Sequence, residues 1–243
     1  MFSTLFNELL HRPLVNLLVF LYEKVTFYDL GLAIIALTIV IRIILFPLFH
    51  KLAHHQRMTQ KIQPHIKKLQ ETHKDNKEAQ TKAIMALYGE HKINPLTPIF
   101  LLLLQLPILI ALYNVFRDGF SEKALASLYP FVSAPASFNH TFLGFIDLNA
   151  SNLLIVLIAT GLQYIQGMVS APKPGGDPQM AKLARNMLFI GPGITLVILW
   201  NLPSALGLYW LTSTAFSIFQ QRVLDKKLDA PEPKKEIGAP GAK

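Results

Sequence analysis

One charged side chain, Arg42, stands inside a long apolar run from Leu30 to Phe49, where every other residue is uncharged. A charged group at the centre of a bilayer costs about 2.5–3.5 kcal/mol on insertion scales, so it faces protein or water rather than lipid. A structural ion pair would need a buried carboxylate, and none of the apolar runs of this sequence contains Asp or Glu. The pattern therefore favours a water-filled cavity around Arg42 over a structural ion pair.

Polar side chains in the other apolar runs could line the same cavity. Four of them recur at helical spacing and share one helix face, namely Thr160, Gln163, Gln166 and Ser170. Trp210, Thr214 and Ser217 lie on one side of a later helix. Hydrogen bonding between helices, worth about 0.6 kcal/mol for each bond, is the alternative role of each residue. We predict a substrate-binding groove lined by Arg42, Thr38, Gln105, Gln163, Gln166, Trp210 and Thr214.

Catalytic chemistry is poorly supported by the residue types present. The sequence has no cysteine, and its apolar runs have no His, Asp or Glu, so an intramembrane protease would lack its catalytic groups. His50 and His54 have i, i+4 spacing, but two ligands alone are a weak metal signal, and solvated positions are favoured. No phosphate-binding glycine loop is present. We expect a protein that is not an enzyme and that uses neither a cofactor nor a metal.

Five apolar runs must position these side chains. Hydrophobic residues make up 51% of the chain and charged residues only 16%, and a spanning helix needs about 20 mostly apolar residues. The predicted class is all-α, a polytopic membrane protein with five transmembrane helices. They cover about 30–49, 96–116, 153–171, 187–202 and 204–221. A turn from Asn201 to Ser204 separates the last two.

The positions of Lys and Arg predict the orientation of these spans. Nine Lys and Arg residues lie between His50 and Lys92, whereas only Arg117 and Lys123 lie between Arg117 and Ala150. Because basic loops stay in the cytoplasm, we expect the N-terminus outside and the C-terminus inside. The net charge of +8 is therefore explained by basic cytoplasmic loops that lie near anionic lipid, and not by binding of nucleic acid.

Three further segments complete the predicted organisation around a core of residues 28–227. Residues 1–27 are expected to form an amphipathic helix on the outer membrane face. A cleaved signal peptide is the alternative, but Glu23 and Lys24 stand where small residues would be needed. Residues 50–92 are expected to form a mobile helical hairpin in the cytoplasm, and residues 228–243 a disordered tail.

Several motifs, taken in order, resemble the YidC family of membrane protein insertases over about residues 27–227. They begin with Arg42 and Pro47 and continue with Ile62-Gln63-Pro64, Asn94-Pro95-Leu96 and Gln105-Leu106-Pro107-Ile108. The most specific is GLYWLTSTAFSIFQQ, from Gly207 to Gln221. Family members often carry Gly-Cys after the Asn-Pro, whereas Thr97 and Pro98 follow Leu96 here. The sequence resembles the compact five-span form.

The resemblance implies an insertase and chaperone of the bacterial plasma membrane. It would move short acidic tails of client proteins through a polar intramembrane groove, with Arg42 attracting the acidic residue, and release apolar helices into lipid. Nascent membrane proteins and the lipid bilayer are the implied partners. A Sec-type channel and the ribosome remain open as partners, and direct nucleic-acid binding is not expected.

Two other functions compete with this interpretation. A small transporter or channel subunit could use Arg42 to bind an anionic solute, although we find no internal repeat of the kind that favours it. An assembly factor that shields spans without inserting them cannot be separated from an insertase by sequence.

Overall fold

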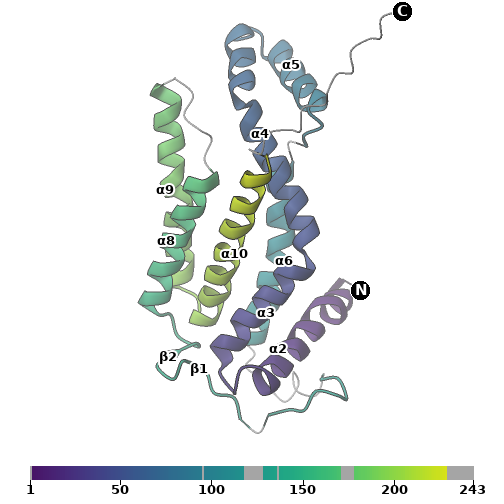
Figure 1. The fold of residues 1–243 in the computed structure, drawn as a ribbon, viewed down its shortest axis with the longest axis vertical. Coiled ribbons are helices and arrows are strands. Elements are labelled where there is room, and N and C mark those ends of the chain that lie inside the picture. Colours follow the sequence, from purple (N-terminus) through teal and green to yellow (C-terminus); the bar gives the residue numbers. More distant parts are fainter. Residues whose placement is uncertain (1, 95, 118–127, 136, 171–177, 229–243) are drawn as a thin grey trace, which may run out of the picture.

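The apolar runs form helices in the structure, a computed structural model that describes residues 2–94, 96–117, 128–135, 137–170 and 178–228 (Figure 1). The predicted all-α class is confirmed, since the described regular structure is helical apart from one small hairpin of strands. The helices are α1 Phe2–Phe6, η1 Asn7–His11 (a π-helical turn), α2 Arg12–Lys24, α3 Leu30–Ile44, α4 Phe46–Thr72, α5 Lys77–Glu90, α6 Thr97–Arg117, α8 Leu153–Ser170, α9 Pro178–Trp200 and α10 Ser204–Leu228. The strands are β1 Thr141–Phe142 and β2 Ile146–Asp147.

Helix α10 lies in the middle of the bundle. It packs against α3 on one side and α8 on the other, and α8 in turn packs against α9 (Figure 1). Burial of branched apolar side chains drives this packing, because each removes apolar surface from contact with polar solvent. The largest core cluster draws on α2, α3, α6 and α10; its fully buried members include Val15, Leu18, Ile34, Leu37, Leu112 and Leu206.

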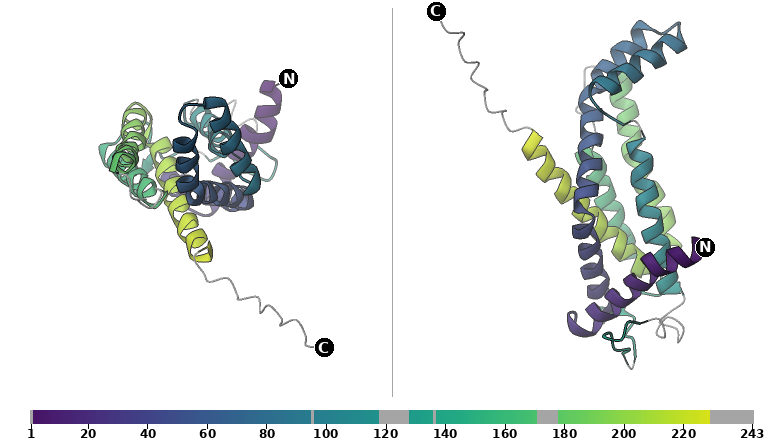
Figure 2. Two further views of the ribbon diagram at one scale, coloured as in Figure 1. Left: turned by 90° about the horizontal axis from the view of Figure 1, so that it is seen from above. Right: turned by 90° about the vertical axis from the view of Figure 1, so that its right-hand side faces the viewer.

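The N-terminal helix α2 is part of this core. One face of α2 is buried, with Val15, Leu18 and Val19 in the main cluster, whereas Phe20 is exposed. This is the pattern of an amphipathic helix. In the right-hand view of Figure 2, α2 runs across one end of the bundle, oblique to the other helices. Its position relative to a membrane stays a prediction.

A sharp bend separates α3 from α4. The axis turns by 71° at Leu45, which lies between the two helices. Pro47 lies in the first turn of α4, and its missing N–H and fixed φ are common causes of such a bend. Arg42 lies in the last turn of α3, just before the bend.

Helices α4 and α5 form a hairpin that extends beyond the rest of the bundle (Figure 1). A small cluster of Ile62, Ile66 and Ile93 holds it together, and the side chain of Asn76 caps α5 by accepting a hydrogen bond from the Ala79 N–H at 2.9 Å. Few buried side chains join the two helices. The hairpin is thus held by few contacts, and the cytoplasmic hairpin expected at residues 50–92 stays a prediction.

The end of the bundle away from the α4–α5 hairpin is formed by loops and by the first turn of α3. Asp29 caps α3, and its two carboxylate oxygens accept hydrogen bonds from the N–H groups of Leu32 at 2.9 Å and Leu143 at 2.7 Å. β1 and β2 pair antiparallel next to this cap. Asp29 therefore holds the strand hairpin to the first turn of α3.

Length and hydropathy alone identify few membrane spans among the described residues. Helix α8 passes as one span, and α3 with the first part of α4 passes as one bent span. Two shorter apolar stretches occur at Gln105–Phe116 and Leu188–Trp200. The five-span count therefore stays a prediction.

Candidate functional site

Arg42 is buried at the contact between α3 and α10, with only 8% of its surface exposed. Its Nε donates a hydrogen bond to Oγ of Ser213 at 3.0 Å, and its Nη2 donates to the same oxygen. The guanidinium carbon lies 4.3 Å from the ring centroid of Phe49, a favourable cation–π position. None of the ion pairs among the described residues involves Arg42. Its described partners are therefore a neutral hydroxyl and an aromatic ring.

A second polar contact lies one helical turn away on α10. The Nε2 group of Gln105, on α6, donates to the hydroxyl of Tyr209 at 2.5 Å. Tyr209 and Ser213 are four residues apart and therefore share a face of α10. The Gln105–Tyr209 and Arg42–Ser213 contacts thus place polar groups side by side between α6, α10 and α3.

Trp210 and Gln163 form a separate contact between α10 and α8. The indole Nε1 donates to Oε1 of Gln163 at 3.4 Å, a long hydrogen bond. Trp210 also packs against the small cluster of Val156, Ala159 and Leu199. The predicted groove residues are therefore found on two sides of α10 rather than around one point.

The remaining predicted site residues have less distinctive surroundings. Thr38 is buried one turn before Arg42, and its hydroxyl donates to the backbone oxygen of Ile34 at 2.7 Å. Thr214 is buried on α10, and Gln166 is half-buried on α8. A buried Oγ1 of Thr160, also on α8, has no hydrogen-bond partner among the described residues.

The predicted list of groove residues does not contain the residues that contact Arg42 most directly. Ser213 and Phe49 are not in the predicted groove, and neither is Tyr209. Tyr209 and Ser213 have i, i+4 spacing within the Gly207–Gln221 motif, and this spacing was the one sequence feature that could have indicated a shared helix face. Which helix face meets α3 could not be read from that spacing alone.

An ion pair outside the apolar runs was missed as well. Nε of Arg57, on α4, lies 2.8 Å from Oδ1 of Asp225, near the end of α10. The side chains are 13% and 22% exposed, so water screens them only partly. This pair holds the start of the hairpin to the last described helix.

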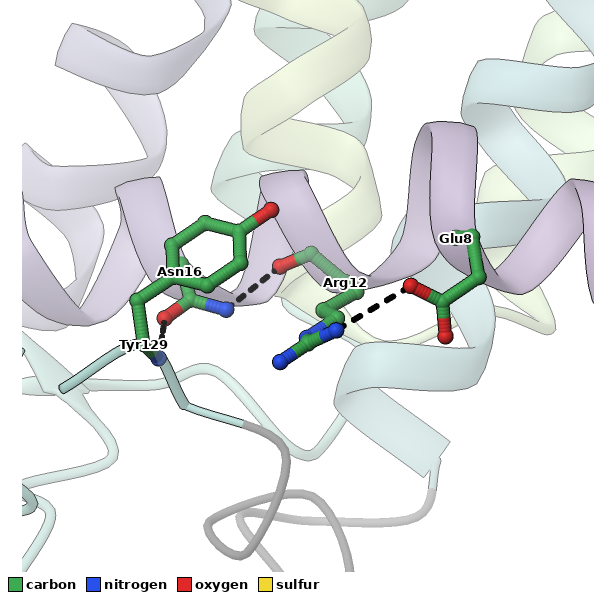
Figure 3. Close-up of polar contacts among 4 residues, drawn as sticks. All are labelled: Glu8, Arg12, Asn16 and Tyr129. Carbon is green, nitrogen blue, oxygen red and sulfur yellow. Dashed lines mark hydrogen bonds and ion pairs between the residues drawn. The ribbon is translucent and has the colours of Figure 1, made fainter.

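The N-terminal helix has its own polar anchor (Figure 3). The buried side chain of Asn16 accepts a hydrogen bond from the Tyr129 N–H at 2.6 Å and donates to the backbone oxygen of Arg12 at 2.8 Å. Arg12 pairs with Glu8 at 3.1 Å, and its guanidinium carbon lies 5.0 Å from the ring centroid of Tyr129. These contacts hold α2 to the segment that follows α6.

The donor groups do not indicate a metal site. Within the residues that the structure describes, no group of three or more His, Cys, Asp and Glu side chains is placed to hold an ion.

Comparison with known proteins connects this geometry to one family. The sequence model of the family described as "60Kd inner membrane protein" matches residues 20–232. The membrane protein insertase YidC of Fusobacterium nucleatum is 32% identical over 220 residues, which cover 90% of this chain and 98% of that protein.

Longer relatives match over a similar stretch of this chain. The membrane protein insertase YidC of Geobacter metallireducens is 32% identical over 227 residues, covering 93% of this chain and 38% of that protein. That of Nitratidesulfovibrio vulgaris is 34% identical over 212 residues, covering 86% of this chain and 37% of that protein. The chain thus spans less than two fifths of the length of these two relatives.

Proposed function

The chain belongs to the YidC family, described as 60Kd inner membrane proteins, and from this premise we propose that it is a membrane protein insertase and chaperone of the bacterial inner membrane. In this proposal it moves a short acidic tail of a client protein through a polar groove between its helices. It then releases the client's apolar helix into lipid. Arg42 is the residue that receives the acidic group.

The surroundings of Arg42 are the observation that supports this role. A buried guanidinium with a serine hydroxyl and an aromatic ring as its described partners keeps a positive charge that no described carboxylate neutralises. A client carboxylate that replaced the Ser213 hydroxyl would add the attraction of opposite charges to a hydrogen bond that now joins the guanidinium to a neutral oxygen. The Ser213 hydroxyl thus binds the guanidinium less strongly than the proposed client carboxylate would.

The magnitude of the attraction is adequate for this task. Opposite charges about 4 Å apart gain roughly 4 kcal/mol at an effective dielectric of about 20. This offsets much of the cost of bringing a carboxylate into the membrane. Transfer of the client's apolar helix into lipid then supplies the net driving force, at about 25 cal/mol for each Å² of apolar surface removed from water.

The polar groups beyond Arg42 would extend the surface offered to the client. Gln105, Tyr209 and Ser213 connect α6 to α3 through α10, and Gln163 and Trp210 add polar atoms on the other side of α10. A client backbone that leaves water needs such hydrogen-bonding partners. In this proposal these side chains exchange their present hydrogen bonds for bonds to the client.

The remaining elements receive roles from the proposed orientation. With the N-terminus outside and the C-terminus inside, the α4–α5 hairpin lies in the cytoplasm and meets the client first. The thin packing of the hairpin suits a mobile receiver. Nascent membrane proteins and lipid are the proposed partners, and a Sec-type channel and the ribosome are further candidates.

Insertion into liposomes that contain only this purified protein tests the proposal. The client is a single-span protein with one Asp in a short N-terminal tail, and protease protection of the tail measures translocation. We expect Arg42→Ala to reduce insertion to the level of empty liposomes and Arg42→Lys to retain much of it. Failure of the wild-type protein to insert the client, with its fold intact, would refute the insertase assignment.

A client variant isolates the charge interaction. Replacing the tail Asp by Asn should weaken insertion by the wild type but change little in Arg42→Ala, because the two changes remove the same contact. Arg57→Ala is the matched control, since Arg57 is also basic but pairs with Asp225 instead. Equal effects of the client change in all three proteins would contradict the role of Arg42 while leaving insertase activity intact.

A further inference from the structure

Four large apolar side chains are exposed together where α3 begins. They are Phe27 and Tyr28, in the turn between α2 and α3, and Leu143 and Phe145, in the β1–β2 hairpin. Phe27 is 92% exposed and Phe145 is 70% exposed, and more than half of the surface of the other two is exposed. We call these four residues the apical patch.

The two halves of the patch are joined rigidly. Asp29, which directly follows Tyr28, accepts the hydrogen bond from the Leu143 N–H at 2.7 Å. The ring of Phe142 lies against Gly31 so closely that a Cβ there would come within 2.2 Å of Cδ2 of the ring. The hairpin therefore lies beside the turn, and both pairs of exposed side chains belong to the same end of the bundle.

The backbone of the patch adopts a conformation that is unfavourable for large side chains. Among the described residues, four that are not glycine have positive φ, and three of them are Phe27 at 53°, Tyr28 at 63° and Leu143 at 53°. Glycine or asparagine adopts this conformation more easily. Leu143 and Gly144 are the two central residues of the turn closed by the hydrogen bond from the Phe145 N–H to the Phe142 oxygen, and both have positive φ, a conformation for which Asn-Gly is favoured. Large exposed apolar residues at three such positions point to a function for their side chains.

We propose that the apical patch inserts into the interfacial layer of the lipid bilayer and anchors this end of the bundle there. Phe27 lies three residues before the first residue of α3, so the patch lies level with the end of that helix. The exposed side chains further along α3, among them Leu32 and Ile39, are apolar as well, so the patch continues a lipid-facing surface. Aromatic rings are enriched at this depth in membrane proteins. The inference relies on the proposed placement of α3 across the bilayer but not on Arg42 or on client insertion.

Spin labels measure the depth of the patch directly. Because the chain has no cysteine, a single introduced cysteine carries a nitroxide at one known position. The labelled variants are Phe27→Cys and Phe145→Cys in liposomes of phosphatidylcholine and phosphatidylglycerol. Ile39→Cys serves as the deep control, and Asn149→Cys as the exposed polar control near the same hairpin. Frequent collisions of the nitroxide with oxygen indicate that the label lies in lipid. Frequent collisions with a water-soluble nickel chelate indicate that it lies in water.

We expect the labels at 27 and 145 to collide readily with oxygen and several-fold less with the chelate than the label at 149. Their depth should lie between those of the labels at 149 and 39. Chelate access at 27 and 145 equal to that at 149, with position 39 deep, would overturn the proposal. Shielding from both reagents would indicate a protein partner or a second copy of this chain instead of lipid. Chelate access at position 39 would refute the placement of α3, and the proposal with it.

A strain-relieving variant separates anchoring from folding. Phe27→Gly removes the ring at a position whose φ suits glycine, so the thermal midpoint in detergent should not fall. In the Phe145→Cys background we expect this change to raise chelate access at the label several-fold, because two of the four patch side chains are then missing. Lys92→Gly is the control, since Lys92 also has positive φ but lies next to the α4–α5 hairpin. An unchanged label depth in Phe27→Gly would contradict the anchoring role.

Discussion

A hydrogen bond between Nε of Arg42 and Oγ of Ser213, 3.0 Å long, joins α3 to α10. The two residues are 171 positions apart in the sequence. This bond places the one charge of the first predicted span against the last described helix. Ser213 and Arg42 are both buried, so breaking their hydrogen bond would leave buried polar groups without a partner, which costs free energy. The contact therefore contributes to the packing of α3 on α10 as well as to the proposed function.

Replacing Ser213 by Ala should destabilise the protein. Nε and Nη2 of Arg42 would both lose the oxygen that accepts their hydrogen bonds, and a hydrogen bond to a charged group contributes about 1.5–3 kcal/mol. Thermal unfolding in detergent measures the change in midpoint. Ser217→Ala is the control, because the hydroxyl of Ser217 donates only within α10, to the backbone oxygen of Ser213. Equal midpoints for the two variants would show that Ser213 does not hold Arg42.

Replacing Gly207 by Ala should disturb the contact between α10 and α8. A Cβ at position 207 would lie 2.7 Å from Cγ2 of Ile155, and overpacking of this kind costs about 1–3 kcal/mol. The double variant Gly207→Ala, Ile155→Ala should recover part of this loss, as unfolding midpoints would show. Gly161→Ala on α8 is the control, since nothing lies within 4 Å of its added methyl group. A loss in the control as large as in Gly207→Ala would argue against a steric cause.

Breaking the Arg57–Asp225 pair should loosen the hairpin from α10. Asp225→Asn leaves a mostly buried guanidinium without its counter-charge, so we expect faster amide hydrogen exchange in the last turns of α10. Lys82→Ala breaks the Glu78–Lys82 pair, which has the same 2.8 Å separation but exposed side chains. Exposed pairs contribute about 0–1 kcal/mol, so Lys82→Ala should leave exchange unchanged. Similar exchange rates in both variants would show that burial of the first pair has no effect.

Replacing Asn16 by Leu should release the segment after α6 from the N-terminal helix. The amide of Tyr129 would lose its acceptor, and hydrogen exchange at that amide should accelerate (Figure 3). Asn16→Asp keeps an acceptor oxygen and should keep most of the protection. If Asn16→Leu left the Tyr129 amide protected, then the packing of α2 alone would hold this segment.

The fold class could be predicted from the sequence because apolar runs at helical length leave few alternatives. The break at Asn201–Ser204 was also readable, since Pro203 and polar residues interrupt the run between α9 and α10. The bend at Leu45 was harder to predict from the sequence. Pro47 indicated a kink, but its size depends on how α4 packs against α10.

The site was predictable only in part. Arg42 stood out because a charge inside an apolar run is costly, and that reasoning needs no knowledge of packing. The partner of Arg42 depends on the rotation of α10 about its axis. Ser213 and Thr214 are adjacent in sequence, and only the packed structure shows that Ser213 faces α3. Gln163 was predicted to line the same groove as Arg42, and in the structure its described hydrogen bond is to Trp210, since α8 packs on another side of α10 than α3 does.

The central position of α10 has a consequence for the order in which the protein can be made. During synthesis, α3, α6 and α8 emerge before their shared partner, so their faces toward α10 have no final contact until the last described helix appears. Arg42 would meanwhile lack Ser213, and Gln105 would lack Tyr209. Contacts between such distant positions close late and slow the final step of folding. A protein with this arrangement of helices would spend part of its own synthesis with the polar side chains that face α10 still unpaired by that helix.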